Sequence, residues 1–170
     1  MVLYIGVIGE RICNEKNRKA AERVGRLIAE NGGVLVCGGM GGVMEAAARG
    51  AASAKGTAIG ILPGTERREA NPYLSFSVVT GMGEGRNIIL VRSCDAIIAI
   101  GGGYGTLSEI AFAHKLDVPV VGIATWSLKR GDRVDEKIVV LSDEHQAVKK
   151  AFELAGRSTA GIQSGRAVSL

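Results

Sequence analysis

Two stretches of the chain place closely spaced glycines directly after an apolar segment. The first reads GGMGGVME over residues 38–45 and the second reads GGYGTLSE over residues 102–109, so both follow the pattern GGxGxxxE. Glycines let a chain turn sharply and let its backbone approach a ligand without a Cβ clash. A helix that begins at such a turn directs unpaired N–H groups and the positive end of its dipole toward that ligand. These residues therefore favour the binding of a phosphate group.

Both turns contribute candidate phosphate-binding residues. They are Gly38, Gly39, Gly41, Gly42, Gly102, Gly103, Tyr104, Gly105 and Thr106. In the second turn, the N–H groups of residues 103–106 would hold the phosphate, and the Thr106 hydroxyl would add a donor. Tyr104 would either stack on a base of the ligand or only shield the turn. The alternative is that these glycines form tight turns that bind no ligand.

Apolar strands and amphipathic helices alternate along the chain around these turns. The expected strands cover residues 3–8, 34–37, 57–62, 75–80, 95–100, 118–123 and 137–141. The expected helices cover residues 15–31, 42–54, 84–93, 106–115 and a last segment that Ser142 caps and Gly156 ends. This alternation predicts an α/β fold with a doubly wound parallel sheet in three layers, α/β/α. In such a sheet both glycine turns emerge at the carboxyl ends of strands, where open α/β folds bind ligands.

The length of the chain, 170 residues, fits a single domain. We expect this domain to cover residues 1–156, with the Gly/Ser/Arg-rich segment 157–170 as a flexible tail. Residues 65–74 are polar, contain a proline and are expected to form a mobile loop over the crevice. A second loop is expected over residues 124–136, around the single tryptophan, Trp126.

The composition argues against several classes of partner. The net charge is +4, but the basic residues are scattered and are not interleaved with aromatic residues, which disfavours nucleic-acid binding. No stretch approaches the roughly 20 apolar residues of a membrane span. The N-terminus has no signal-peptide pattern, so we expect a cytoplasmic protein without a membrane partner. The three cysteines and two histidines are too few and too widely spaced to predict a metal site.

Two common nucleotide-binding fingerprints are missing from the chain. The dinucleotide pattern GxGxxG does not follow the first strand, where residues 6–10 read GVIGE. The second strand ends at Cys37 instead of at a carboxylate that would bind a ribose. The P-loop pattern GxxxxGK[ST] is also missing. NAD binding and ATP hydrolysis are therefore disfavoured.

Three motifs resemble those of the LOG-type proteins (LONELY GUY, cytokinin-activating phosphoribohydrolases). They are GGGYGTLSE at 101–109, GMGEGRN at 81–87 and CGGMGGVME at 37–45. The resemblance covers about residues 2–155 and points to a small bacterial branch whose relatives include molybdenum cofactor carrier proteins. It implies a Rossmann-like fold and a homodimer or higher homo-oligomer. Many related sequences carry a lysine decarboxylase label, which the residues of this chain do not support.

The chain departs from the LOG hallmark at two positions. That hallmark is PGGxGTxxE together with an upstream Arg-Lys pair. Gly101 replaces the proline and Asn87 replaces the lysine, whereas Arg86 and Glu109 match.

The resemblance implies catalytic roles for Arg86 and Glu109. In LOG enzymes the matching residues act in splitting the N-glycosidic bond of a nucleoside 5′-monophosphate, which releases free base and ribose 5-phosphate. A carboxylate can stabilise an oxocarbenium-like sugar and orient a water, and a guanidinium can hold phosphate or ribose oxygens. The alternatives are structural. Thr106 and Glu109 have the spacing of a capping box, and Arg86 could be a solvated helix residue.

Two functions from different classes follow. The first is a phosphoribohydrolase that acts on nucleoside 5′-monophosphates, requires no cofactor and uses Arg86 and Glu109. The second is a carrier of a phosphorylated pterin such as molybdenum cofactor, without chemistry. The missing proline and lysine favour the carrier, and the retained Arg86 and Glu109 favour the enzyme. Both functions share the recognition of a phosphorylated small molecule, with a nucleotide or molybdenum cofactor as the possible bound group.

Overall fold

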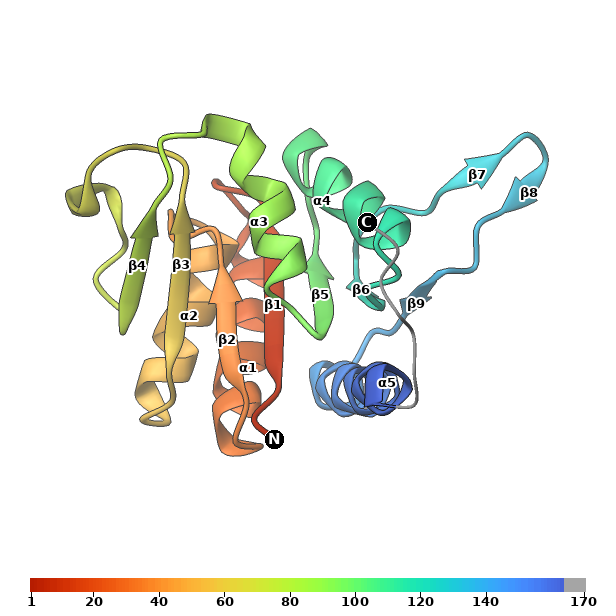
Figure 1. Ribbon diagram of the computed structural model, residues 1–170, viewed down its shortest axis with the longest axis horizontal. Helices are drawn as coiled ribbons and strands as arrows, with labels where there is room; N and C mark the ends of the chain where they lie inside the picture. The colour runs from red at the N-terminus through yellow and green to blue at the C-terminus, as the bar shows by residue number, and fades with distance from the viewer. Residues whose placement is uncertain (164–170) are drawn as a thin grey trace.

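The computed structural model describes the backbone of residues 1–163 and the side-chain environment of residues 1–157. Its centre is a parallel seven-stranded sheet with the order β4-β3-β2-β1-β5-β6-β9 (Figure 1). The strands are β1 (Tyr4–Gly9), β2 (Val34–Cys37), β3 (Ala58–Leu62), β4 (Phe76–Val79), β5 (Ala96–Ile100), β6 (Val120–Ile123) and β9 (Ile138–Val140). The predicted doubly wound α/β fold is therefore confirmed.

Helices cover both faces of the sheet (Figure 1). They are α1 (Glu15–Glu30), α2 (Val43–Ser53), α3 (Arg86–Arg92), α4 (Tyr104–Lys115) and α5 (Glu144–Gln163). The first two and α5 lie on one face, and α3 and α4 lie on the other. In the described part of the chain, none of the helices is long and apolar enough to cross a membrane.

Side chains that alternate in direction along the buried strands form a hydrophobic cluster on each face of the sheet. Val7 belongs to the hydrophobic cluster beneath α1, α2 and α5, and its neighbour Ile8 belongs to the cluster beneath α3 and α4. Successive strand residues point to opposite faces, so an apolar run buried on both sides supplies both clusters. This explains why β5, which reads AIIAI, is buried along its whole length.

Glycines bring α1 and α2 into close contact. A Cβ atom at Gly25 would lie 1.9 Å from the Ala47 carbonyl oxygen, and one at Gly50 would lie 1.9 Å from the Glu22 carbonyl oxygen. Each glycine therefore faces the backbone of the opposite helix. The two helices are locked at a separation that only a hydrogen atom at these positions permits.

The last helix differs from the prediction at both ends. Asp143, not Ser142, caps it, since the Asp143 Oδ1 accepts a hydrogen bond from the Gln146 N–H at 2.8 Å. The predicted end at Gly156 is wrong, because α5 continues to Gln163. An isolated glycine costs a helix only about 1 kcal/mol, which the flanking helix-forming residues offset. The remainder of the predicted tail, 164–170, lies outside the described residues.

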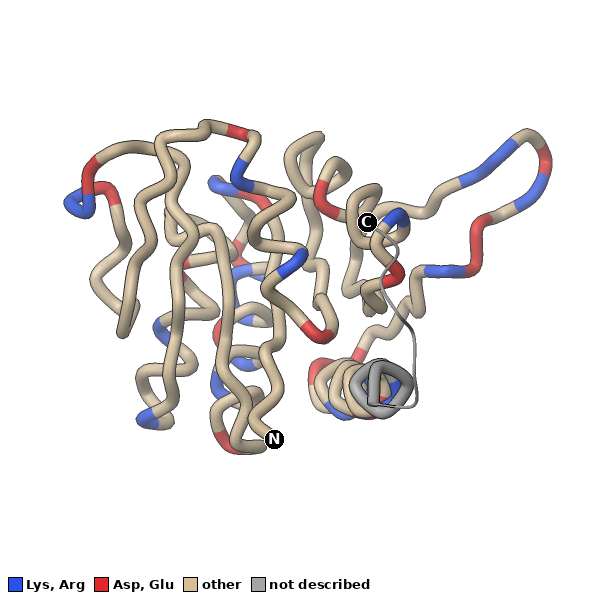
Figure 2. Tube along the Cα trace, in the orientation of Figure 1, with Lys and Arg blue, Asp and Glu red and all other residues tan. Residues whose placement is uncertain are grey.

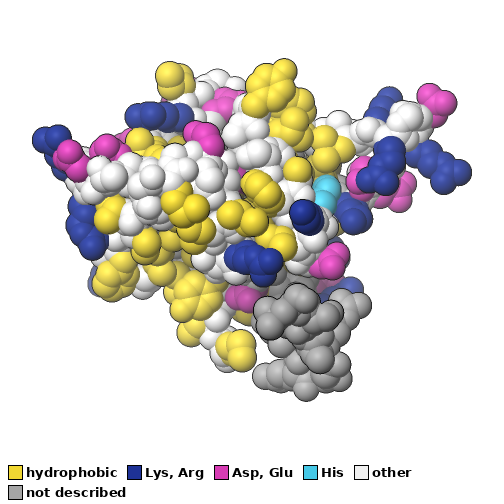
Figure 3. All heavy atoms as spheres, turned by 45° about the horizontal axis from the view of Figure 1, so that its top comes forward, with side chains coloured by type: hydrophobic (Ala, Val, Ile, Leu, Met, Phe, Trp, Pro, Cys, Tyr) yellow, Lys and Arg dark blue, Asp and Glu magenta, His cyan; other side chains and the backbone are white. Residues whose placement is uncertain are grey.

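The two predicted loops contain short regular elements. Residues 124–136 include an antiparallel hairpin of β7 (Lys129–Arg130) and β8 (Arg133–Val134). This hairpin projects from the body of the protein and carries both basic and acidic residues (Figures 2 and 3). The other loop contains the 3₁₀ turn η1 (Arg67–Glu69).

Candidate functional site

A cavity of about 280 Å³ opens at the carboxyl edge of the sheet. The chain adds β2, β3 and β4 on one side of β1 and then returns to add β5 on the other side. Loops diverge at such a switch point and leave a crevice between them. The cavity wall includes Glu10 and Arg11 after β1, Gly38 after β2, Arg86 from α3 and Glu109 from α4.

The second glycine turn presents a helix N-terminus to this cavity. Gly103 is the N-cap residue of α4, and no side chain caps the helix. The first intrahelical bond runs from the Leu107 N–H to the Gly103 carbonyl oxygen at 3.0 Å. The N–H groups of the first helical turn have no acceptor within the helix. Because Gly103, Gly105 and the buried Thr106 line the cavity, these groups lie at its wall.

The predicted capping box between Thr106 and Glu109 is wrong. The helix begins two residues earlier than expected, at Tyr104, so Thr106 is its third residue and not its cap. Glu109 lies one turn further along, buried, with its Oε1 3.8 Å from the Arg86 Nη1. The carboxyl group therefore faces the cavity and Arg86.

Arg86 is buried with its hydrogen-bonding capacity largely unused. Its residue exposure is 7%, and its Nε and Nη1 have no hydrogen-bond partner among the described residues. A Cβ atom at Gly38 would lie 2.4 Å from the Arg86 Nη1, so only a glycine at position 38 leaves room for the guanidinium. Unsatisfied buried donors are costly, and at a cavity wall they indicate a binding group.

The environment of Glu109 shifts its protonation equilibrium. Burial raises the pKa of the Glu109 carboxyl to about 7, with a smaller opposing effect from Arg86 and a further increase from Glu84. Desolvation penalises the charged form, which explains the direction. Near neutral pH this carboxyl can therefore either donate or accept a proton.

Stability should depend on pH through Glu109. Its pKa is raised from 4.5 to about 7 on folding, so between these values only the unfolded chain loses the proton. The free energy of unfolding should therefore fall by up to about 3 kcal/mol as pH rises through this window and level off above it. Urea unfolding at several pH values gives the free energy of unfolding as a function of pH for wild type and for Glu109→Gln, and the two curves are compared. Parallel profiles would contradict the assignment, and Glu30→Gln, at an exposed position, is the control.

Among the wall residues that the sequence prediction missed are two charged residues directly after β1, Glu10 and Arg11. Glu10 Oε1 accepts a hydrogen bond from the Gly102 N–H at 2.9 Å, which joins the loop after β1 to the turn after β5. Arg11 lines the cavity beside it. Both follow the first strand directly, at the edge where open α/β folds bind ligands, and this position is the signal that could have identified them.

Most of the first glycine turn lies outside the cavity wall. The cavity wall, as the structure describes it, includes Gly38 but not Gly39, Gly41 or Gly42. Gly42 has φ 66°, and a Cβ there would lie 2.2 Å from the Glu10 carbonyl oxygen. That oxygen accepts a hydrogen bond from the Val43 N–H at 3.0 Å, so the loop after β1 covers the start of α2.

The loop of residues 65–74 packs on the same turn. The Asn71 N–H donates to the Gly39 carbonyl oxygen at 2.9 Å, and the Asn71 side chain donates to the Met40 carbonyl oxygen at 3.1 Å. Asn71 is buried. These contacts attach the loop to the first turn, and Met40 then contributes to the cavity wall.

Tyr104 lies outside the cavity. Its side chain is 83% exposed, and its ring centroid is 5.9 Å from that of Trp126. The Trp126 Nε1–H donates to the Gly103 carbonyl oxygen at 3.3 Å. The two rings therefore cover the outer side of the glycine turn, which favours shielding over stacking on a ligand.

The chain has a Rossmann-like fold with a cavity at the topological switch point of its sheet. The chain belongs to the SLOG cluster4 family, whose family model matches residues 2–156. This result and the solved relatives confirm the resemblance to the LOG-like superfamily and its molybdenum cofactor carrier branch.

Three relatives illustrate the family. An uncharacterized protein of Archaeoglobus fulgidus is 47% identical over 135 residues, which cover 79% of this chain and 89% of that protein. The molybdenum cofactor binding protein of Rippkaea orientalis is 33% identical, with a TM-score of 0.80 and coverage of 91% of this chain and 98% of that one. The molybdenum cofactor carrier protein of Chlamydomonas reinhardtii is 32% identical, with a TM-score of 0.78 and coverage of 92% and 99%.

Proposed function

We propose that the protein is a carrier that binds a phosphorylated pterin of the molybdenum cofactor type without converting it. The observation that carries this proposal is the buried Arg86 guanidinium, whose Nε and Nη1 have no hydrogen-bond partner among the described residues, in the same cavity wall as the start of α4. Such donors gain acceptors when a phosphorylated group binds. The solved proteins from Rippkaea orientalis and Chlamydomonas reinhardtii support the class of cargo.

The phosphate of the cargo is proposed to bind at the second glycine turn. There the N–H groups of residues 103–106 and the Thr106 hydroxyl would donate to the phosphate oxygens, and the helix dipole would stabilise the charge. The Arg86 guanidinium would supply a positive charge that does not vary with pH. This set of donors fits an anionic group.

The rest of the cavity suits a flat heterocycle with polar edges. Ile8, Met40, Met44 and Pro63 contribute apolar side chains to its wall. The buried Asn87 Oδ1 has no hydrogen-bond partner among the described residues, although its Nδ2 donates to the Ser108 Oγ at 3.0 Å. Ligand sites commonly combine an apolar lining with a few convergent polar groups. The free Asn87 oxygen is therefore proposed to accept a hydrogen bond from the heterocycle.

One observation favours a second candidate, a nucleoside 5′-monophosphate phosphoribohydrolase. Glu109 faces the cavity with its pKa raised to about 7, beside Arg86. A carboxyl group with such a pKa is suited to proton transfer near neutral pH. In this reading Glu109 would orient or deprotonate the attacking water and Arg86 would hold phosphate or ribose oxygens.

One set of assays tests both candidates. Purified protein is mixed with the pterin cofactor released from a molybdoenzyme, passed through a sizing column and oxidised, and pterin fluorescence is measured in the protein fraction. In parallel, the protein is incubated with a panel of nucleoside 5′-monophosphates, and free base is followed by chromatography. Light scattering on the same preparation tests the homo-oligomer that we also propose.

We expect pterin fluorescence to elute with the protein and no free base to be released. Pterin that elutes entirely apart from the protein would overturn the carrier proposal. Base release by wild type that is lost in Glu109→Gln would instead establish the hydrolase and its catalytic carboxyl group.

A further inference from the structure

A second cavity, of about 600 Å³, lies on the other side of the Glu10–Gly102 contact. Its wall is formed by the start of α1, the turn after β5 and the turn after β6. Glu10 is the one described residue that lines both cavities.

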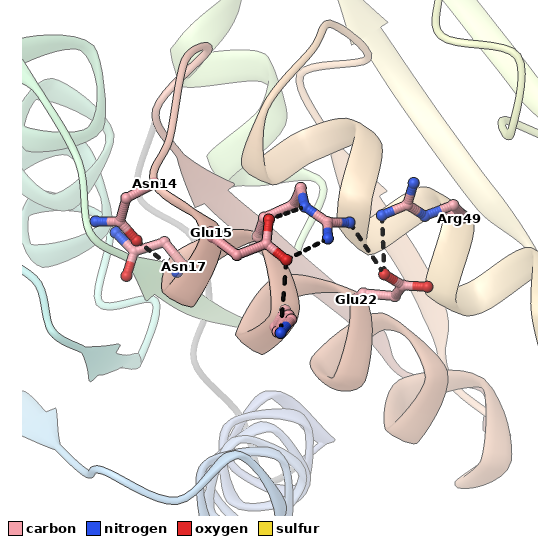
Figure 4. A network of polar contacts seen from close by, with 7 residues as sticks. Asn14, Glu15, Asn17, Glu22 and Arg49 are labelled. Atoms are coloured by element: carbon pink, nitrogen blue, oxygen red, sulfur yellow. Dashed lines mark hydrogen bonds and ion pairs between the residues drawn. The ribbon is translucent and has the colours of Figure 1, made fainter.

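A buried amide with no partner lines this second cavity. Asn17 is 7% exposed, and its side-chain amide makes no hydrogen bond with any described residue. Its backbone N–H is satisfied by the Asn14 Oδ1 at 2.8 Å. Figure 4 shows this Asn14–Asn17 contact at the start of α1, set apart from the ion pairs that link Glu15 to Arg49. The amide atoms are open to the cavity and can both donate and accept a hydrogen bond there, as a ligand would require.

The turn after β5 leaves space for this amide. Gly101 has φ 58°, and a Cβ atom there would lie 2.4 Å from the Asn17 Nδ2. This position is where LOG enzymes have the proline of their hallmark motif. Gly101 thus admits the Asn17 side chain beneath the turn.

The wall of the same cavity carries one lysine, Lys16, and one carboxylate, Glu10. Lys16 lines it, and its ammonium group forms no ion pair with the described part of the chain. Arg18 and Lys19, by contrast, both pair with Glu15. The first-turn N–H groups of α1 have no acceptor within the helix, and they carry the positive end of its dipole.

We propose that this cavity is a second oxyanion subsite, in which Asn17, Lys16 and the start of α1 bind a phosphate-like group. The Glu10 carboxylate is held by the Gly102 N–H at the boundary between the two cavities. The oxyanion is either a free ion or a second anionic group of a ligand that also occupies the first cavity. The subsite goes beyond the proposed carrier function and does not depend on it.

The subsite is tested by titrating inorganic phosphate into ¹⁵N-labelled protein and following amide NMR signals. We expect signals of Glu15, Lys16 and the Asn17 side chain to shift with one dissociation constant. Lys16→Ala should raise that constant about tenfold, the loss expected for one charge-assisted hydrogen bond. Lys19→Ala is the matched control, about one helical turn further along α1, and it should leave the dissociation constant unchanged.

Asn17→Leu provides the second variant. Because it replaces an unpartnered buried amide by an apolar side chain of similar size, it should fold and keep or raise the Tm. It should also abolish the phosphate shifts at the start of α1. A wild-type protein whose α1 signals do not move at 100 mM phosphate, roughly the limit of a weak single-ion site, would overturn the proposal.

The same spectra separate this subsite from the first cavity and its two possible occupants. Shifts at residues 103–106 report binding in the first cavity, and shifts at the start of α1 report binding in the second. If one of these two sets of shifts is missing, only the corresponding site is overturned. Adenosine 3′,5′-bisphosphate and 5′-monophosphate then distinguish the sources. If one ligand spans both cavities, the bisphosphate binds more tightly in wild type but not in Lys16→Ala. If the ion is free, phosphate shifts the α1 signals equally with the monophosphate already bound.

Discussion

Arg86→Ala is expected to weaken the binding of a phosphorylated pterin by at least about 100-fold, because it removes two or more charge-assisted hydrogen bonds worth about 1.5–3 kcal/mol each. In wild type the Nε and Nη1 are buried and have no hydrogen-bond partner among the described residues, although Nη1 lies 3.8 Å from the Glu109 Oε1. Arg86 lines the cavity, so loss of its guanidinium should appear in the dissociation constant of an anion bound there. Fluorescence of the oxidised pterin retained at increasing cargo concentration measures the effect.

The controls separate binding from folding. Arg92→Ala removes the exposed arginine at the other end of α3 and should leave binding unchanged. Arg86→Lys keeps the charge but not the planar fork, so it should retain only part of the affinity. The guanidinium lowers the pKa of Glu109, so this pKa should rise further in Arg86→Ala. The Glu109 carboxyl would then be neutral and should not prevent the variant from folding. Full affinity in a folded Arg86→Ala protein would contradict the site.

Gly25→Ala is expected to destabilise the protein by about 3 kcal/mol, although alanine is the better helix former. The added methyl group would lie 1.9 Å from the Ala47 carbonyl oxygen, a backbone atom that cannot rotate away. Relief requires α1 and α2 to move apart, which loosens the hydrophobic cluster that they form on one face of the sheet. Urea unfolding monitored by circular dichroism measures the loss.

Gly156→Ala is the matched control for that substitution. Gly156 also lies within a helix, α5, but a Cβ there would meet no atom of the described residues within 4 Å. Its replacement should raise the free energy of unfolding by about 0.5–1 kcal/mol, the ordinary gain in helix propensity. Equal effects of the two substitutions would show that α1 and α2 are not in backbone contact at Gly25.

The sequence predicted the architecture because that depends on local patterns. Continuous apolar runs such as 96–100 identify strands buried on both faces, and all seven expected strands are present in the sheet. The hairpin within 124–136 escaped prediction because it consists of two-residue strands with charged residues and no apolar alternation. Propensity alone gives little signal for such short pairs.

The candidate site was predicted only in part, because its residues are brought together by tertiary packing. Arg86 and Glu109 are 23 positions apart in the printed sequence, and only the packing of α3 against α4 brings their charged groups to 3.8 Å. Local pattern alone suggested a capping box for Glu109, because the TxxE spacing matches that motif in the sequence, which does not show that α4 begins at Tyr104. Glu10 was missed since its partner, the Gly102 N–H, lies 92 residues away.

The Glu10–Gly102 contact has a consequence for the release of a bound anion. The Glu10 carboxylate accepts a hydrogen bond from the Gly102 N–H of the turn, so in the proposed carrier that donor would be satisfied after a ligand leaves. In the carrier that we propose, Glu10 would compete with a bound anion for the Gly102 N–H, which adjoins the donors of residues 103–106, and would so limit retention. A protein that hands its cargo to a recipient benefits from such a limit, because cargo held too tightly would never be transferred.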